Sequence, residues 1–269
     1  MNLSQVKLVV TDMDGTLLNS KNKVSALFFN QFNELKKHNI HFVAASGRQY
    51  QSILDKLDCI KDDISIIAEN GGIMQHIHKT EVLLKLSSED VLKSVEILRT
   101  VKGSYIVLCG KKTAYIETKD SHFLSKLKEY YKVYKTVDDL TKVTDDDFLK
   151  IAVFHFESSE TQILPHINDI ENELQVTVSG QNWLDISHKE ANKGYALKIL
   201  QEALGIKSEE TMVFGDYNND VEMLKLAHFS YAMENAHPNV KNVAKFKTKS
   251  NNELGVEFVL KQLIESKTA

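Results

Sequence analysis

The stretch VVTDMDGTLLNS, residues 9 to 20, places Asp12 and Asp14 at the end of a short apolar run and follows them with Gly15. The run KLVV before Asp12 is short and β-branched, which predicts a buried strand that ends at a turn. Aspartate and glycine are favoured in turns, so the stretch alone could be a plain connection. An EF-hand is poorly supported, because Gly15 is the fourth residue from Asp12 instead of the sixth and no glutamate closes the loop. The rest of the chain decides what the two carboxylates do.

Strands and helices alternate in the first seventy residues. The segment SALFFNQFNELKKHN places Phe28, Phe32 and Leu35 at i, i+4 and i+7, which predicts an amphipathic helix. The apolar runs IHFVAA (40–45) and ISIIA (64–68) predict two further buried strands. The same rhythm returns in the last third of the chain, with a helix in ANKGYALKILQEALG and a strand in TMVF. This alternation predicts an α/β fold class with a doubly wound parallel sheet.

The middle of the chain has a different pattern. Short alternating segments such as YIVLCGKKTAYIET and KIAVFHFES predict strands, and SSEDVLKSVEILRTV predicts a helix between them. A separate α+β unit fits this pattern. We place its boundaries at the changes of rhythm, which gives a core of residues 1–82 and 188–269 and an inserted unit of residues 83–187.

Composition excludes several classes of protein. The 269 residues are 42% hydrophobic and 26% charged, which is typical of a folded globular chain with one large or two modest domains. The net charge of −4 and the dispersed lysines give no basic surface for nucleic acid. No stretch approaches the ~18 apolar residues of a membrane span, and the N-terminus lacks a signal-peptide pattern. We therefore expect a cytoplasmic protein with no membrane partner. Cys59 and Cys109 form no CxxC pattern, and we expect them to be small core residues.

The polar residues follow the predicted parallel strands. In such a sheet, ligands bind beyond the carboxyl ends of the strands, so these residues should face one crevice. Four carboxylates close together repel one another unless a cation is present, and a cluster of oxygen ligands without His or Cys suits Mg²⁺. The sequence therefore predicts a magnesium site. The residues expected at this crevice are Asp12, Asp14, Gly15, Thr16, Ser46, Gly47, Arg48, Gly215, Asp216, Asn219 and Asp220.

One carboxylate beyond those that hold the ion could act as a nucleophile, since aspartate can accept a phosphoryl group. Asp12 would attack phosphorus, and Asp14 would protonate the leaving oxygen and later activate water. The three non-bridging oxygens of the phosphoryl group then need cations and hydrogen-bond donors. The donors available are the Ser46 hydroxyl, the Gly47 backbone N–H, the Lys193 ammonium and the Asn219 amide.

The motifs DMDGTLL, ASGR, NKG and GDYNND, in this order, resemble the four motifs of the haloacid dehalogenase (HAD) superfamily, and specifically of its Cof-like branch of sugar-phosphate-type phosphatases. The segments ENGG (69–72), AMENAHPNVK (232–241) and SNNELGVEFVL (250–260) also resemble that branch. The resemblance implies a Rossmann-like core with an α+β cap inserted between the second and third motifs. Glu234 departs from the pattern, where glycine is more usual, and this puts only the local loop shape in question.

The resemblance implies a role for each motif residue. Asp12 is the expected nucleophile and Asp14 the general acid and base, with Ser46 and Lys193 on the transferred phosphoryl group. The magnesium ligands are expected to be Asp12, the backbone carbonyl of Asp14, and Asp216. Asn219 resembles the phosphate-contacting Asn, and Asp220 supports the metal site without touching the ion. Arg48 and Asn70 are candidates for contact with the substrate.

Together these features predict a Mg²⁺-dependent phosphomonoester hydrolase that acts on a small phosphorylated metabolite through an aspartyl-phosphate on Asp12. A phosphotransferase or phosphomutase using the same site is an alternative, and a non-catalytic sensor of a phosphorylated ligand is another. Asp14 favours hydrolysis, because ion-pumping members of the superfamily have threonine at this position. The chain could be a monomer or a small homo-oligomer. We expect Trp183 to be a packing residue in preference to a platform for the substrate.

Overall fold

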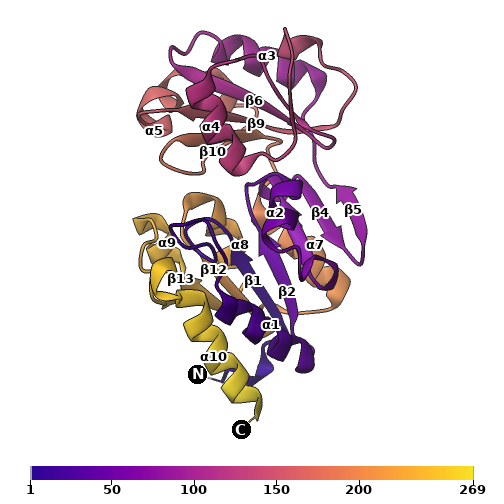
Figure 1. The fold of residues 1–269 in the computed structure, drawn as a ribbon, viewed down its shortest axis with the longest axis vertical. Helices are drawn as coiled ribbons and strands as arrows, with labels where there is room; N and C mark the ends of the chain where they lie inside the picture. Colours follow the sequence, from indigo (N-terminus) through magenta and orange to yellow (C-terminus); the bar gives the residue numbers. More distant parts are fainter. Residues whose placement is uncertain (1, 269) are drawn as a thin grey trace.

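The computed structural model describes residues 2–268 and has two lobes, each built on its own β-sheet (Figure 1). One lobe contains both ends of the chain and is called the core. The other, made from the middle of the chain, is called the cap. The chain leaves the core sheet at Val82 and returns from the cap sheet at Ser187. We keep residues 83–187 as our proposed extent of the cap.

The core sheet has eight strands in the order β14-β13-β12-β1-β2-β3-β4-β5. All neighbours from β14 to β3 pair in parallel, and β4 and β5 add an antiparallel hairpin at one edge. The predicted doubly wound parallel sheet is therefore confirmed. The strands are β1 (Leu8–Asp12), β2 (His41–Ala45), β3 (Ser65–Ala68), β4 (Ile73–His76), β5 (Lys79–Val82), β12 (Thr211–Gly215), β13 (Phe229–Ala232) and β14 (Phe246–Lys247).

Helices cover both faces of the core sheet. In Figure 1, α1 and α10 lie in front of the sheet, where they pack together, and α7 and α8 pack together behind it. The Ser25 side chain caps α1, which buries Phe28, Phe32 and Leu35 as its periodicity predicts. Each such buried side chain contributes roughly 1.5–3 kcal/mol. The core helices are α1 (Ala26–Lys37), α2 (Tyr50–Lys56), α7 (Lys193–Leu204), α8 (Val221–Lys225), α9 (Pro238–Val243) and α10 (Gly255–Thr268).

The cap sheet has six strands in the order β10-β11-β9-β6-β7-β8, antiparallel except for the pair β7 and β8. Side chains alternate along β6, so that Leu108 joins one apolar cluster while Val107 and Cys109 join another. The strands are β6 (Ser104–Gly110), β7 (Ala114–Ile116), β8 (Tyr134–Thr136), β9 (Phe148–His155), β10 (Gln175–Val178) and β11 (Trp183–Ser187). The cap helices are α3 (Ser88–Leu98), α4 (Ser121–Tyr130), α5 (Ser159–Gln162) and α6 (Asn168–Glu171).

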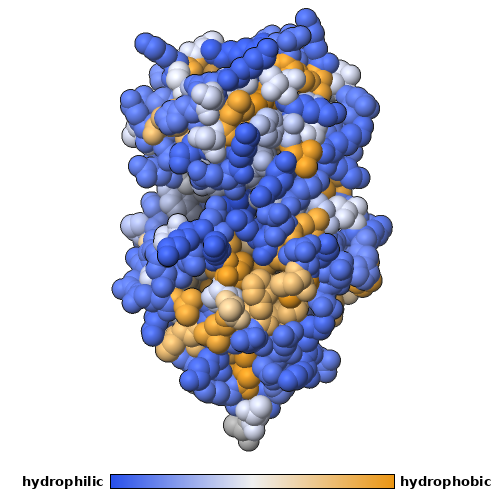
Figure 2. All heavy atoms as spheres, viewed as in Figure 1, coloured by the Kyte–Doolittle hydropathy of each residue, from blue (hydrophilic) through white to orange (hydrophobic). Residues whose placement is uncertain are grey.

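The surface is mostly hydrophilic, with smaller apolar areas on the core below its junction with the cap (Figure 2). Leu27 on α1 and Phe258 on α10 are among the exposed apolar side chains. No helix in residues 2–268 is long and apolar enough to cross a membrane. The expectation for the cysteines holds for Cys109, which is buried, but is wrong for Cys59, which is exposed just beyond α2.

Candidate active site

Neighbouring strands β12, β1, β2 and β3 end on the side of the core that faces the cap (Figure 1). Asp12 is the last residue of β1, and Ser46 and Asp216 come directly after β2 and β12. Lys193 is the first residue of α7, so it comes from a helix and not from a strand end. A cleft of about 450 Å³ separates the two lobes here and is lined by residues of both. The sheet topology thus brings together motif residues that lie as many as 204 positions apart in the sequence, as Asp12 and Asp216 do.

Three carboxylates form a cluster at the floor of this cleft. Oxygens of Asp12, Asp216 and Asp220 lie within 4.8 Å of one another. The buried Lys193 ammonium is 2.5 Å from Asp12 Oδ1 and 2.7 Å from Asp220 Oδ1. One cation therefore faces three carboxylates.

The excess of negative charge appears in the pKa values. Burial, reinforced by Asp220, raises the pKa of Asp12 to about 7 although Lys193 opposes the shift. Burial and the neighbouring carboxylates Asp12 and Asp220 also raise the pKa of Asp216. Burial works against the charge on Lys193, but Asp12 and Asp220 raise its pKa above the ordinary value. A cluster of carboxylate oxygens with more negative than positive charge fits a hard divalent cation such as Mg²⁺.

The DGT sequence after Asp12 is required by the packing around Asp216. Thr16 donates a hydrogen bond from Oγ1 to Asp216 Oδ1 at 3.0 Å. Gly15 has φ +73°, and a Cβ atom there would lie 2.2 Å from Asp216 Oδ2. Asp220 completes the support, because its Oδ2 accepts the backbone N–H groups of Asp216 and Tyr217 at 2.9 and 3.0 Å. Asp216 is therefore held in place from three sides.

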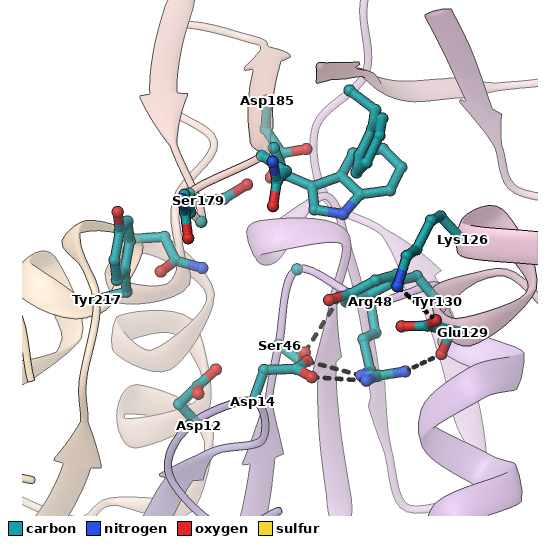
Figure 3. Close-up of a pocket in the computed structure, with 18 of the residues that line it drawn as sticks. Asp12, Asp14, Ser46, Arg48, Lys126, Glu129, Tyr130, Ser179, Asp185 and Tyr217 are labelled. Carbon is teal, nitrogen blue, oxygen red and sulfur yellow. Dashed lines mark hydrogen bonds and ion pairs between the residues drawn. The ribbon is translucent and has the colours of Figure 1, made fainter. Parts of the chain in front are cut away.

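Asp14 lies apart from the cluster and pairs with Arg48 (Figure 3). Arg48 Nε and Nη2 donate to the two oxygens of Asp14, each at 2.6 Å. Burial disfavours the charge on Arg48, but the hydrogen bonds to Asp14 raise its pKa. The Asp14 side chain keeps 41% of its surface exposed, so it stays open to the cleft.

The rest of the Arg48 guanidinium joins the core to the cap. Nη1 donates to the Glu129 carbonyl oxygen at 2.6 Å, near the C-terminal end of α4, and the Tyr130 ring lies 4.7 Å away (Figure 3). Its remaining hydrogen bonds go to Ser52 and Asn22. All five N–H groups of the Arg48 guanidinium are thus hydrogen-bonded within the protein. The contact between Arg48 and the substrate stays a prediction.

The other predicted contacts are also connected to the cap. Asn219 lines the cleft and donates from Nδ2 to Asn70 Oδ1 at 3.0 Å. Asn70 in turn donates to Asp185 Oδ2 of β11 at 2.6 Å. Ser46 and Gly47 line the cleft, and Ser46 Oγ accepts the Arg48 backbone N–H at 3.1 Å. Asn70 therefore acts on the site through Asn219 and the cap.

A second buried lysine was not found from the sequence. Lys150 of β9 is 2% exposed and donates to the Gly47 carbonyl oxygen at 2.6 Å. Its ammonium also lies 3.1 Å from Asp185 and 3.2 Å from Glu69. Burial opposes the charge on Lys150, but Asp185 and Glu69 raise its pKa. This cluster crosses between the lobes, and neither Lys150 nor Asp185 belongs to a sequence motif.

Gln49 forms another contact that no motif indicated. Its Oε1 accepts the backbone N–H groups of Lys132 and Val133, both at 3.0 Å, and its Nε2 donates to the Val133 carbonyl at 2.8 Å. The only signal in the sequence is that Gln49 directly follows the ASGR motif. Arg48 and Gln49 together bind residues 129–133 of the cap to the end of β2.

The cap side of the cleft carries an aromatic wall, defined here as Tyr130, Phe154, Phe156 and Trp183. The ring centroids of Trp183 and Phe154 are 4.9 Å apart, and those of Trp183 and Tyr130 are 5.5 Å apart. Trp183 therefore packs against its neighbours as expected, but it also faces the cleft. All four residues of the wall belong to the cap, whereas the carboxylate cluster belongs to the core. Both line the same cleft.

Comparisons with known proteins agree with this geometry. The profile of the family described as haloacid dehalogenase-like hydrolase matches residues 9–260. The Escherichia coli protein named 5-amino-6-(5-phospho-D-ribitylamino)uracil phosphatase YbjI is 33% identical over 263 residues, covering 97% of both chains. The crystal structure of SMU.1108c from Streptococcus mutans is 31% identical, with a TM-score of 0.90, and covers 97% of this chain and 99% of its own.

A third similarity supports the fold alone. The sugar phosphatase BT4131, a HAD member of subclass IIB, superposes with a TM-score of 0.81 at 22% identity and covers 96% of this chain and 98% of its own. The chain belongs to the haloacid dehalogenase-like hydrolases and is a phosphatase-type member of that family.

Proposed function

We propose that this protein is a Mg²⁺-dependent phosphomonoester hydrolase that uses Asp12 as its nucleophile. The observation that carries the proposal is the position of Asp12 at the floor of the cleft, beside Lys193 and two further carboxylates. Lys193 keeps one oxygen of Asp12 fixed, which orients the carboxylate for attack on phosphorus. The alternative of a sensor without catalysis has no use for this arrangement.

The transferred phosphoryl group needs donors for its three non-bridging oxygens. Ser46 and Gly47 offer a hydroxyl and a backbone N–H from the end of β2, and both line the cleft. Asn219 offers an amide from the opposite side, held by Asn70. Lys193 neutralises charge that develops next to Asp12. These groups surround the space directly beyond the β1 end.

Asp14 is the general acid and base in this proposal. It first gives a proton to the leaving oxygen and then takes a proton from the water that attacks the aspartyl-phosphate. Arg48 uses two of about four acceptor positions on the Asp14 carboxylate, which leaves lone pairs for this proton transfer. The proton transfers therefore occur on the side of Asp14 that is open to the cleft.

We propose Asp12, Asp216 and the backbone carbonyl of Asp14 as the groups that hold Mg²⁺. When bound, the ion supplies positive charge that offsets the carboxylates and the phosphoryl oxygens. Asp220 does not need to touch the ion, because its oxygens are already bound by Lys193 and by the backbone of residues 216 and 217.

The substrate class follows from the cleft and from a relative. A volume of about 450 Å³ lies within the roughly 300–1,000 Å³ of small-ligand sites. The Escherichia coli relative is named for a small phosphorylated metabolite. We propose that the substrate here is also a small phosphorylated metabolite, with the cap covering its leaving group.

The test is phosphate release from a panel of phosphorylated metabolites, with Mg²⁺ and with chelator, for wild type and Asp12→Asn. Asp58→Asn is a matched control, since Asp58 pairs with Lys61 on the surface. We expect release that needs Mg²⁺, survives Asp58→Asn and is lost in Asp12→Asn. Normal release by folded Asp12→Asn would sink the mechanism. Phosphate transfer to an added sugar without release to water would favour the phosphotransferase alternative.

A further inference from the structure

The aromatic wall carries an inference about the leaving group of the substrate. Its four residues come from α4, from β9 with the position after it, and from the start of β11. Three of them, Tyr130, Phe156 and Trp183, remain partly exposed. They line a cleft whose other end is the carboxylate cluster. A substrate with its phosphoryl group at Asp12 therefore extends toward the rings.

We propose that the aromatic wall binds a flat aromatic ring carried by the leaving group of the substrate. This inference rests on the proposed function and adds the substrate class. Neighbouring rings within the wall meet at interplanar angles of 63° to 86°, so they form a folded apolar surface instead of one closed stack. Such a surface accepts another ring in offset or edge-to-face contact.

The polar groups near the wall favour an aromatic ring over a sugar ring. A sugar carries hydroxyls on nearly every carbon, and each one needs a partner when it leaves water. The carboxylate of Asp185 is already bound by Lys150 and Asn70, and Lys126 is paired with Glu129. The charged side chains beside the wall are therefore already paired, and the wall itself offers mainly ring carbons for contact.

Some donors at the cleft are still available for the rim of a ring. Within residues 2–268, the Trp183 indole N–H and the Tyr130 hydroxyl make no hydrogen bond to the protein. The side chains of Ser179 and Gln181, in the loop between β10 and β11, line the cleft and also make none; Ser179 lies above the cleft in Figure 3. These groups suit a heteroaromatic ring whose edge carries carbonyl oxygens or ring nitrogens.

The first test compares three esters of primary alcohols, whose leaving groups have similar reactivity. These are 2-phenylethyl phosphate, 2-cyclohexylethyl phosphate and a hexose 6-phosphate. Acetyl phosphate serves as a fourth substrate whose leaving group is too small to use the wall. We expect kcat/KM for the phenyl ester to exceed that of the cyclohexyl ester by roughly 2- to 12-fold, and that of the hexose ester by more.

Variants assign the preference to the wall. Trp183→Leu should remove the advantage of the phenyl ester and should lower kcat/KM for acetyl phosphate much less. Tyr134→Leu is the matched control, because Tyr134 is a half-buried aromatic residue of the cap that does not line the cleft. A preference for the hexose ester would overturn the proposal. So would an equal loss on every substrate in Trp183→Leu, or an unchanged preference for the phenyl ester.

A binding measurement keeps the inference testable without catalysis. Trp183 is the single tryptophan of the chain, so its fluorescence reports directly on the wall. Titration with 2-phenylethylphosphonate should change the emission and saturate at lower concentration than the cyclohexyl analogue or a hexose phosphonate. Equal or weaker binding of the phenyl compound would overturn the aromatic subsite. If the wild-type protein binds 2-phenylethylphosphonate but does not hydrolyse acetyl phosphate, the proposed function is overturned instead.

Discussion

Lys193 and Lys150 are two buried lysines in nearly the same electrostatic setting. They are 0% and 2% exposed, and each lies between two carboxylates. In both cases burial opposes the charge and the carboxylates overcome it, so that the pKa is raised. Burial and a perturbed pKa therefore do not distinguish the two lysines.

The difference lies in what else surrounds them. Lys193 contacts Asp12 and Asp220, and a third carboxylate, Asp216, lies within 4.8 Å of both. This cluster therefore has an excess of carboxylates at the floor of the cleft. Lys150 instead binds the Gly47 carbonyl at 2.6 Å and joins cap to core. We infer that the larger excess of carboxylates marks the chemistry. Lys150, although it also lines the cleft, fixes the position of the cap.

The largest expected effect separates the two lysines by activity. Lys193→Met should lower kcat with acetyl phosphate by more than about 10³-fold, because it removes the cation that orients Asp12. Lys150→Met should change kcat with acetyl phosphate much less, because Lys150 does not touch the carboxylate cluster. Steady-state phosphate release, with folding checked by circular dichroism, measures both. Comparable losses in the two variants would break the distinction.

The next effect concerns stability. Lys150→Met should lower the free energy of unfolding by about 3–5 kcal/mol, since it leaves Glu69 and Asp185 buried without a cation. Adding Glu69→Gln to this variant should recover part of the loss, because it removes one of the uncompensated charges. Urea unfolding followed by circular dichroism gives these values. A loss below about 1 kcal/mol would show that Lys150 is not the link between the lobes.

The charge excess at Lys193 also predicts a pH dependence for the metal-free protein. The folded-state pKa of Asp12 is about 7, against an ordinary value of 3.8. Because the folded protein holds the Asp12 proton more tightly than the unfolded chain does, Asp12 contributes to the free energy of unfolding. This contribution is complete below about pH 3.8 and is lost as the pH rises through about 7. Between pH 5 and pH 8, the protein in chelator should lose about 3 kcal/mol of unfolding free energy.

Two controls identify Asp12 as the cause of this loss. Asp12→Asn has no titrating group at this position and should show a smaller loss over the same pH range. Excess Mg²⁺ should oppose the loss in wild type, because a bound cation favours the ionised carboxylates. Urea unfolding at both pH values gives the comparison. Wild-type stability that increases from pH 5 to pH 8 in chelator would contradict the charge excess.

The sequence predicts Lys193 as a site residue but gives no sign of Lys150, and the reason is physical. Asp12, Ser46, Lys193 and Asp216 lie at strand or helix ends, where turn residues and glycine interrupt the apolar pattern. The topology of a parallel sheet then places these ends together. The α/β fold class and the members of the carboxylate cluster follow from this rule.

Lys150 and Asp185 lie inside cap strands, where a buried charge has no local signal. The alternation along β9 and β11 does not show which lobe a side chain meets. The orientation of the cap depends on long-range contacts between residues such as Gly47 and Lys150. The place of Trp183 on the cleft could not be separated from packing for the same reason, since packing and lining have the same sequence pattern.

The smallest predicted effect concerns Arg48, the other link between cap and core. Arg48→Lys keeps the positive charge but cannot bind both oxygens of Asp14 while also reaching the Glu129 carbonyl. We expect kcat/KM for alkyl phosphates, whose leaving oxygen needs a proton, to fall about 10-fold, or ~1.4 kcal/mol.

Acetyl phosphate separates a positioning role from a structural one, because its leaving group departs without a proton from Asp14 and its kcat/KM should change little. Arg99→Lys is the matched control, since Arg99 pairs with Glu117 and Asp139 in the cap, away from the cleft. An equal loss on both kinds of substrate in Arg48→Lys would mean that Arg48 only holds the lobes together. A loss confined to alkyl esters would mean that the cap contact at Arg48 controls the acid, while Lys150 supports the cap without taking part in the reaction.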